Sequence, residues 1–167
     1  MADFTAKNLK RRFVQQFQAP PDKVFPFLCP VREYEWIEPW QCELLHSDSG
    51  MAEKNCVFRT RAPGELSDDM WVISRYEPNA RIEFVRVNAC RVMTLAITLT
   101  DNGDGATSAV NEQVLVGLTE EGNQRLDDMA KDFFFEMRMG EAMLNHYLTT
   151  GTRLPLQEAI AIASKPK

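Results

Sequence analysis

Alternating hydrophobic and polar positions dominate the first two thirds of the chain and predict an antiparallel sheet. Residues 11–18 alternate, with Phe13 and Phe17 on one face, which is typical of a strand with one buried face. Further alternating segments follow between residues 40 and 116, separated by turn sequences such as Asp48-Ser49-Gly50. Connections this short require antiparallel neighbours, because a parallel return needs a dozen residues or more. The strands expected in this meander are 40–47, 55–61, 69–76, 81–87, 91–100 and 107–116.

Prolines divide the region between the first strand and the meander into two short helices. Proline is tolerated in the first turn of a helix, so residues 21–28 predict one short helix, although Pro26 limits its length. A second helical piece is expected over residues 31–37, where Pro39 stops it. Near the C-terminus, residues 156–163 predict a further short helix.

The last third of the chain predicts one long helix. No proline occurs between Thr119 and residue 148, and apolar side chains recur at three-and-four spacing along one face. Thr119 is placed to cap the start of the helix, and Gly151 to stop its end. At 1.5 Å per residue the helix is about 45 Å long. It needs a large apolar partner, and only the sheet can supply one.

Composition and charge narrow the class of protein. The chain has 167 residues, 44% hydrophobic and 26% charged, which is ordinary for a globular protein and fits one domain over residues 1–167. We expect its core over about residues 10–150 and a tail over 152–167. The net charge of −5 works against binding a polyanion, so no nucleic-acid partner is expected. The basic residues between Lys7 and Arg12 are interpreted as the solvated start of the first strand.

Motifs for metals, cofactors and membranes are missing from the sequence. The four cysteines, Cys29, Cys42, Cys56 and Cys90, lack the spacing of a zinc site, and we expect reduced, buried thiols. No phosphate loop, dinucleotide fingerprint or nucleophile motif occurs, so neither a metal nor a cofactor is expected. The N-terminus has no apolar signal segment and no stretch reaches the length of a membrane span. We therefore expect a cytoplasmic protein with no integral membrane association.

Three stretches carry a family resemblance. Residues 17–25 (FQAPPDKVF) place a proline–acid pair before a Val-Phe anchor, as at a strand-to-helix entry. Residues 50–60 (GMAEKNCVFRT), with Trp71 and Tyr76-Glu77-Pro78 beyond, form the strand pair that follows, and Gly117-Leu118-Thr119 precedes the long helix. With the order of elements, these stretches resemble the START-like, or helix-grip (SRPBCC), superfamily, in its polyketide cyclase/dehydratase-like and lipid-transport-like branch. The resemblance implies an α+β fold in which an antiparallel sheet of about seven strands wraps around the long C-terminal helix, with two short helices after the first strand. It also implies a cavity between sheet and helix for a hydrophobic or amphipathic small molecule, whereas periodicity alone equally allows a solid core.

Aromatic and sulfur-containing side chains are the candidates for contact with such a ligand. Strand parity favours Met93, Leu95, Ile97 and Leu99 inward, although one bulge would reverse that prediction. Methionine suits a pocket that tolerates varied ligands. The alternative is that all of these side chains pack as core. The candidate ligand-binding residues are Trp36, Phe58, Trp71, Phe84, Met93, Leu95, Met129, Phe133 and Met137.

Groups for proton chemistry are few. His46 ends the face that Cys42 and Leu44 begin and would be an acid or base if that face is concave, although an exposed strand end is the plainer interpretation. Glu112 is functional if it points inward and routine if it points outward, and the mixed pattern of its strand does not decide. Arg75 and Arg86 share parity with inward candidates, and either could reach an anionic ligand group; surface pairing with Glu77 or Glu83 is the plainer alternative.

Three functions remain open on the sequence. The first is a carrier or sensor of a lipid or polyketide-like molecule, the second a cyclase or dehydratase that uses the same cavity, and the third a chaperone-cofactor-like interaction module. An inward His46, Glu112 or arginine would favour the enzyme. A homodimer through sheet edges or the long helix also stays open.

Overall fold

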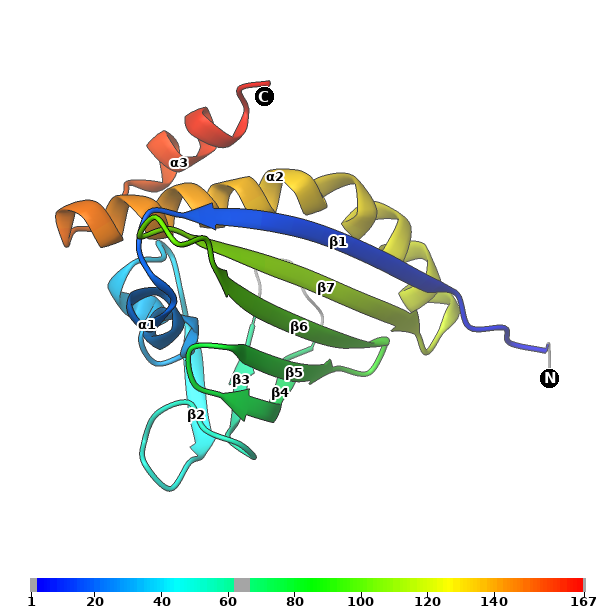
Figure 1. Ribbon diagram of the computed structural model, residues 1–167. Coiled ribbons are helices and arrows are strands. Elements are labelled where there is room, and N and C mark those ends of the chain that lie inside the picture. The colour runs from blue at the N-terminus through cyan, green and yellow to red at the C-terminus, as the bar shows by residue number, and fades with distance from the viewer. Residues whose placement is uncertain (1–2, 62–66, 167) are drawn as a thin grey trace.

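A computed structural model describes residues 3–61 and 67–166 and has the α+β architecture that the sequence predicts. One sheet of seven strands runs in the order β1-β7-β6-β5-β4-β3-β2, with every neighbouring pair antiparallel (Figure 1). The strands are β1 (Asn8–Phe17), β2 (Cys42–His46), β3 (Val57–Thr60), β4 (Asp69–Glu77), β5 (Arg81–Val87), β6 (Arg91–Asp101) and β7 (Thr107–Gly117). The meander is confirmed strand by strand.

The long helix α2 (Glu120–Thr150) lies across the inner face of the sheet, against β1 and β7 (Figure 1). The Thr119 side chain accepts a 3.0 Å hydrogen bond from the Gly122 N–H at its start, and Gly151 ends it in the left-handed conformation, with φ of 69°. A Cβ atom at Gly122 would lie 1.9 Å from the Cys90 carbonyl oxygen, so glycine is what allows this first turn to approach the β5–β6 turn.

The short helices differ in detail from the prediction. The helix expected over residues 21–28 is α-helical only in α1 (Pro21–Val24) and continues as the 3-10 turn η1 (Phe25–Leu28), because Pro26 has no N–H to donate. The second piece shrinks to a single 3-10 turn, η2 (Glu33–Glu35). The last helix, α3 (Leu156–Ala163), matches the expected bounds and packs on α2.

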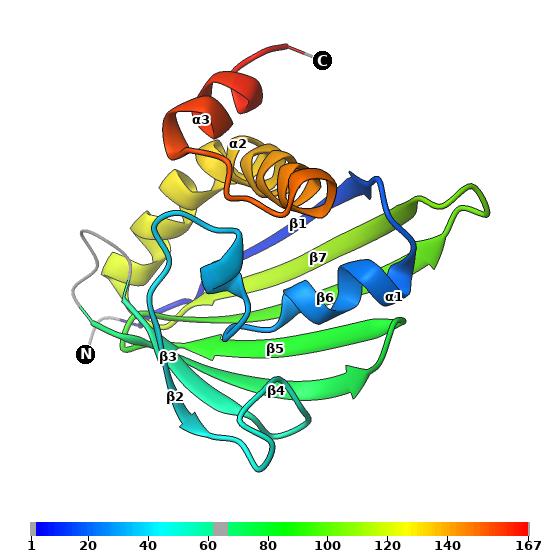
Figure 2. The same cartoon turned by 90° about the vertical axis from the view of Figure 1, so that its left-hand side faces the viewer.

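Two clusters of buried side chains form the core. The larger one joins the α1–η1 segment to the C-terminal half of α2 and the sheet, with Val24, Ile73 and Leu144 fully buried. Figure 2 shows α1 and the segment after it on the face of the sheet that α2 also covers. A smaller cluster of Met93, Leu115 and Leu126 fills the other end. Trp71 and Leu95 contact both clusters and lie between them.

Membrane-spanning helices, metal sites and cysteines bear on the class of protein that the sequence predicts. Within residues 3–61 and 67–166, no helix has the length and apolarity to cross a membrane, and no group of three metal-ligating side chains gathers. All four cysteines are free. Cys29 and Cys56 are buried as expected, whereas Cys42 and Cys90 are half-buried.

Candidate functional site

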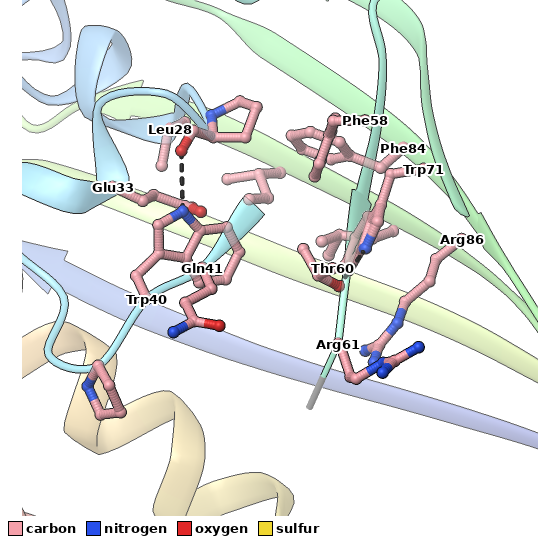
Figure 3. Close-up of a pocket in the computed structure, with 14 residues that line it drawn as sticks. Leu28, Glu33, Trp40, Gln41, Phe58, Thr60, Arg61, Trp71, Phe84 and Arg86 are labelled. Carbon is pink, nitrogen blue, oxygen red and sulfur yellow. Dashed lines mark hydrogen bonds between the residues drawn. The ribbon is translucent and has the colours of Figure 1, made fainter. Parts of the chain in front are cut away.

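The inner face of the sheet carries a pocket of about 380 Å³. Strands β3 to β6 form one wall, and the segment from Leu28 to Gln41 forms the other (Figure 3). The side chains on the sheet wall are mostly apolar: Phe58, Thr60, Arg61, Trp71, Phe84, Arg86, Leu95 and Ile97. Those on the opposite wall are Leu28, Pro30, Glu33, Pro39, Trp40 and Gln41.

This pocket lies to one side of the place that the sequence predicted. We expected a cavity between the sheet and the long helix, but among the described residues that line this pocket none belongs to α2. Polar side chains of β1 instead hold α2 against the sheet: Gln15 donates to the Met137 carbonyl and Arg11 to the Met129 carbonyl, both at 2.8 Å. The segment around η2, rather than the long helix, faces the aromatic wall.

Four of the nine candidate ligand contacts line the pocket. These are Phe58, Trp71, Phe84 and Leu95. The other five pack outside its lining: Trp36 in the larger core cluster, Met93 and Met129 in the smaller one, and Phe133 and Met137 on α2. Of the inward set on β6, Met93 and Leu99 are buried, and Leu95 and Ile97 face the pocket.

Three rings from three adjacent strands build the aromatic wall. Phe58 and Trp71 are register partners on β3 and β4, and their rings stack with centroids 5.5 Å apart and planes 10° apart. The Phe84 ring on β5 meets both edge-on, at 6.4 Å and 6.0 Å. Stacked and edge-to-face contacts of this kind stabilise one another and restrict ring motion. The wall is therefore apolar and preorganised.

The indole N–H groups at the pocket are already satisfied. Trp71 Nε1 donates to Thr60 Oγ1 at 2.9 Å, and Trp40 Nε1 donates to the Pro30 carbonyl at 2.9 Å. Both tryptophans thus keep their polar atoms bonded to protein groups.

A buried carboxylate anchors the cationic edge of the pocket. Asp69 is fully buried and accepts hydrogen bonds from Arg86 Nη2 and, at 2.8 Å, from Asn88 Nδ2. The buried Arg91 lies beside it, with Nη2 at 3.4 Å from Asp69 Oδ2. The Arg86 guanidinium also lies over the Trp71 ring, 4.8 Å from its centroid. Sequence reasoning missed Asp69, although it shares strand parity with the inward Trp71 and Ile73.

Glu33 is the one acidic side chain among the described residues that line the pocket. It is half-buried, and no described residue donates a hydrogen bond to its carboxyl group. Burial raises the pKa of Glu33 from its ordinary value of 4.5 to about 8, so the neutral acid predominates at pH 7. The signal that could have found it is spacing, because Glu33 precedes the buried Trp36 by three residues and so shares its face of a 3-10 turn.

Both candidates for proton chemistry on the sheet lie away from the pocket. His46 is exposed at the end of β2, beyond a bulge between Leu44 and His46. Glu112 is exposed on the outer face of β7, and its neighbours Asn111 and Gln113 point inward and are buried.

The arginine candidates separate into two groups. A bulge between Ile73 and Arg75 turns Arg75 to the outer face, where it pairs with Glu77 at 2.7 Å and with Glu83 at 3.5 Å. Arg86 keeps the inward orientation and lines the pocket. Arg75 therefore pairs on the surface, whereas Arg86 lines the pocket and pairs there with Asp69.

Arg11 corrects the interpretation of the basic first strand as a solvated start. Its guanidinium is half-buried beneath α2, donates to Gln113 Oε1 at 2.7 Å and lies 4.4 Å from the Phe133 ring centroid. Burial lowers the pKa of Arg11. The alternation that turns Phe13 and Phe17 inward turns Arg11 inward as well.

Comparison with known proteins identifies the fold. No protein-family model matches the chain, and no curated protein matches its sequence. Solved structures do match: protein Mll3558 from Rhizobium loti has a TM-score of 0.59 and 13% identity over 83% of this chain and 99% of that one. Norcoclaurine synthase from Thalictrum flavum, in complex with dopamine and hydroxybenzaldehyde, has a TM-score of 0.61 and 10% identity over 87% and 89%.

A third similar structure is DynU16, a putative protein in the dynemicin biosynthetic locus. Its TM-score is 0.57, with 21% identity over 86% of this chain, which spans 48% of DynU16. Identities this low show the fold alone. The chain has the helix-grip fold, as its sequence resemblance implied.

Proposed function

We propose that the protein binds a hydrophobic or amphipathic small molecule, lipid or polyketide-like, in the pocket between strands β3–β6 and the segment from Leu28 to Gln41, as a carrier or sensor. The observation that carries this proposal is the aromatic wall of Phe58, Trp71 and Phe84 around a space of about 380 Å³. Small-molecule sites are concave, mostly apolar and of roughly 300–1,000 Å³, with a few polar groups that fix orientation.

The size and shape of the pocket favour a flat ligand of modest size. Aromatic ligands pack well against aromatic side chains, and Phe58, Trp71 and Phe84 all line the site. The norcoclaurine synthase of the same fold was solved with dopamine and hydroxybenzaldehyde, which are small aromatic molecules. This supports an aromatic ligand without identifying it.

Native mass spectrometry of freshly purified protein, followed by denaturing extraction, tests the proposal. A co-purifying hydrophobic molecule is the expected result. Ile97→Phe places a ring in the pocket and should lower retention of that molecule at least tenfold. Val114→Phe places the same ring on the outer face of β7, where Val114 is exposed, and should retain the molecule as the unmodified protein does. Equal retention by both variants would contradict the proposed site.

A cyclase or dehydratase activity in the same pocket is the second candidate. Glu33 favours it, because a carboxyl group with its pKa raised to about 8 by burial can both give and take a proton near neutral pH. The test is to incubate the extracted molecule with the protein and follow its mass and absorption spectrum. A product that the unmodified protein forms and Glu33→Gln does not would favour the enzyme, and an unchanged molecule would favour the carrier.

A further inference from the structure

We propose that Glu33 holds a proton inside the pocket and donates it in a hydrogen bond to a carbonyl oxygen of a flat aromatic ligand. This inference rests on the proposed function and names the chemical group that the pocket recognises. The ligand class is an aromatic ketone, or another flat conjugated molecule with a carbonyl oxygen on its edge.

The position of Glu33 gives the first step. Its backbone is fixed at both ends of η2, because Glu33 N–H donates to the Cys29 carbonyl at 3.0 Å and the Glu33 carbonyl accepts from Trp36 N–H at 3.2 Å. Its side chain lies on the wall opposite the aromatic rings (Figure 3). A rigid turn therefore presents the carboxyl group to the ligand space, across the pocket from the aromatic wall.

The second step is the absence of a partner for the carboxyl group. Several other polar lining groups form bonds within the protein: Trp71 to Thr60, Trp40 to Pro30, and Arg86 through Nη2 to Asp69, whereas the buried Arg86 Nε has no partner. Among the described residues none hydrogen-bonds the Glu33 carboxyl. A polar group in an apolar pocket is costly unless it is paired, and a bound ligand supplies the pairing.

The charges around the pocket select the kind of partner. Among the described residues, the ionic side chains that line it besides Glu33 are Arg61 and Arg86, and each is paired with a carboxylate, Arg61 with Asp68 and Arg86 with Asp69. The thiol of Cys42 on β2 also lies near Glu33, and its pKa is raised, chiefly by burial, so it stays uncharged at neutral pH. Burial raises the pKa of Glu33 to about 8, which leaves a neutral acid whose O–H needs an acceptor. A carbonyl oxygen fits that need.

Two probes of nearly the same shape test the inference. 2-Acetylnaphthalene carries a carbonyl group, and 2-isopropenylnaphthalene replaces its oxygen with a methylene group. Their dissociation constants, measured by quenching of tryptophan fluorescence at pH 6.0 and pH 9.5, give a ketone-to-alkene ratio at each pH. We expect the protein to prefer the ketone about fivefold at pH 6.0, the size of one net hydrogen bond, and to lose that preference at pH 9.5.

Variants separate the hydrogen bond from the charge. Glu33→Gln keeps an N–H donor and should prefer the ketone at both pH values, whereas Glu33→Leu should bind both probes equally at both. Glu112→Gln changes an exposed acid on the outer face and should behave as the unmodified protein does. Because each result is a ratio, a general change in affinity cancels.

The outcomes distinguish this inference from the proposed function. Binding of both probes with equal affinity at pH 6.0, or a ketone preference that survives in Glu33→Leu, overturns the role of Glu33 and leaves the pocket as a ligand site. If neither probe binds and the purified protein has a clean mass, both the inference and the proposed function are overturned.

Discussion

The Tyr147 hydroxyl on α2 donates a 2.8 Å hydrogen bond to the Glu35 carboxylate on η2. Glu35 also accepts from Arg32 Nε at 2.8 Å and from Arg32 Nη2 at 3.1 Å, and the Arg32 bond, ahead of the Tyr147 bond, lowers the pKa of Glu35. The C-terminal end of the long helix thus holds the turn that carries Glu33. The helix contributes to the pocket by fixing the opposite wall rather than by lining it.

Tyr147→Phe should lower the free energy of unfolding by about 0.5–1 kcal/mol, because it removes one partly exposed hydrogen bond to a charged group. Urea denaturation measures the change. Tyr76→Phe is the matched control, since no described residue bonds the Tyr76 hydroxyl, and it should stay within about 0.5 kcal/mol of the unmodified protein. Equal losses of unfolding free energy in both variants would contradict a stabilising role of the Tyr147–Glu35 hydrogen bond between α2 and η2.

Thr60→Val should cost about 1–2 kcal/mol, although the two side chains have the same shape. The substitution removes the acceptor of the Trp71 indole N–H and leaves that donor unpaired in a buried site. Thr100→Val, at an exposed position of β6, is the control and should have little effect on the denaturation midpoint. A neutral Thr60→Val would mean that water or another group satisfies Trp71.

Asp69→Asn should destabilise the fold by about 3 kcal/mol or more, since it leaves Arg86 and Arg91 beside a site without its buried negative charge. Asp68→Asn, one residue earlier, breaks surface pairs with Arg59 and Arg61 and should cost less than about 1 kcal/mol. Thermal unfolding of the two variants compares them directly. Similar losses would show that burial of Asp69 carries no special weight.

Glu33 should make stability depend on pH in a definite direction. Burial raises the pKa of Glu33 from 4.5 to about 8, so between these values the folded state keeps a proton that the unfolded state releases. The contribution of Glu33 to the free energy of unfolding therefore falls as pH rises through this window and levels off above pH 8. The stability of Glu33→Gln relative to the unmodified protein should rise between pH 5 and pH 8 in urea denaturation. A constant difference would contradict the raised pKa.

Most of the fold could be predicted because the alternation of apolar and polar residues and the turn sequences indicate the same strands along the chain. Residues 81–87 were predicted as a strand and form β5 with the same bounds, and the inward set on β6 follows simple parity. Arg75 shows where parity fails, since the bulge after Ile73 inserts one residue and reverses the face. No residue type near Ile73 predicts this bulge from the sequence.

The site was harder to predict, because one of its walls is the irregular segment from Leu28 to Gln41. The strands supplied Phe58, Trp71 and Phe84 correctly as inward rings, but the opposite wall comes from residues whose path is fixed by tertiary contacts such as Trp36 Nε1 to the Phe27 carbonyl, at 3.1 Å. Glu33 gained its raised pKa from that packing. A lone acid in a short turn between two prolines reads as solvated until its surroundings are known.

The indole N–H signals of the three tryptophans give the most direct test of ligand binding in this pocket. Trp40 and Trp71 line the pocket, whereas Trp36 is buried in the core outside its lining and serves as an internal control. In a ¹H–¹⁵N spectrum assigned with single Trp→Phe variants, titration with 2-acetylnaphthalene should shift the Trp40 and Trp71 signals and leave Trp36 in place. A shift of Trp36 alone, equal shifts of all three, or no shift at a saturating concentration would contradict a ligand site at the aromatic wall.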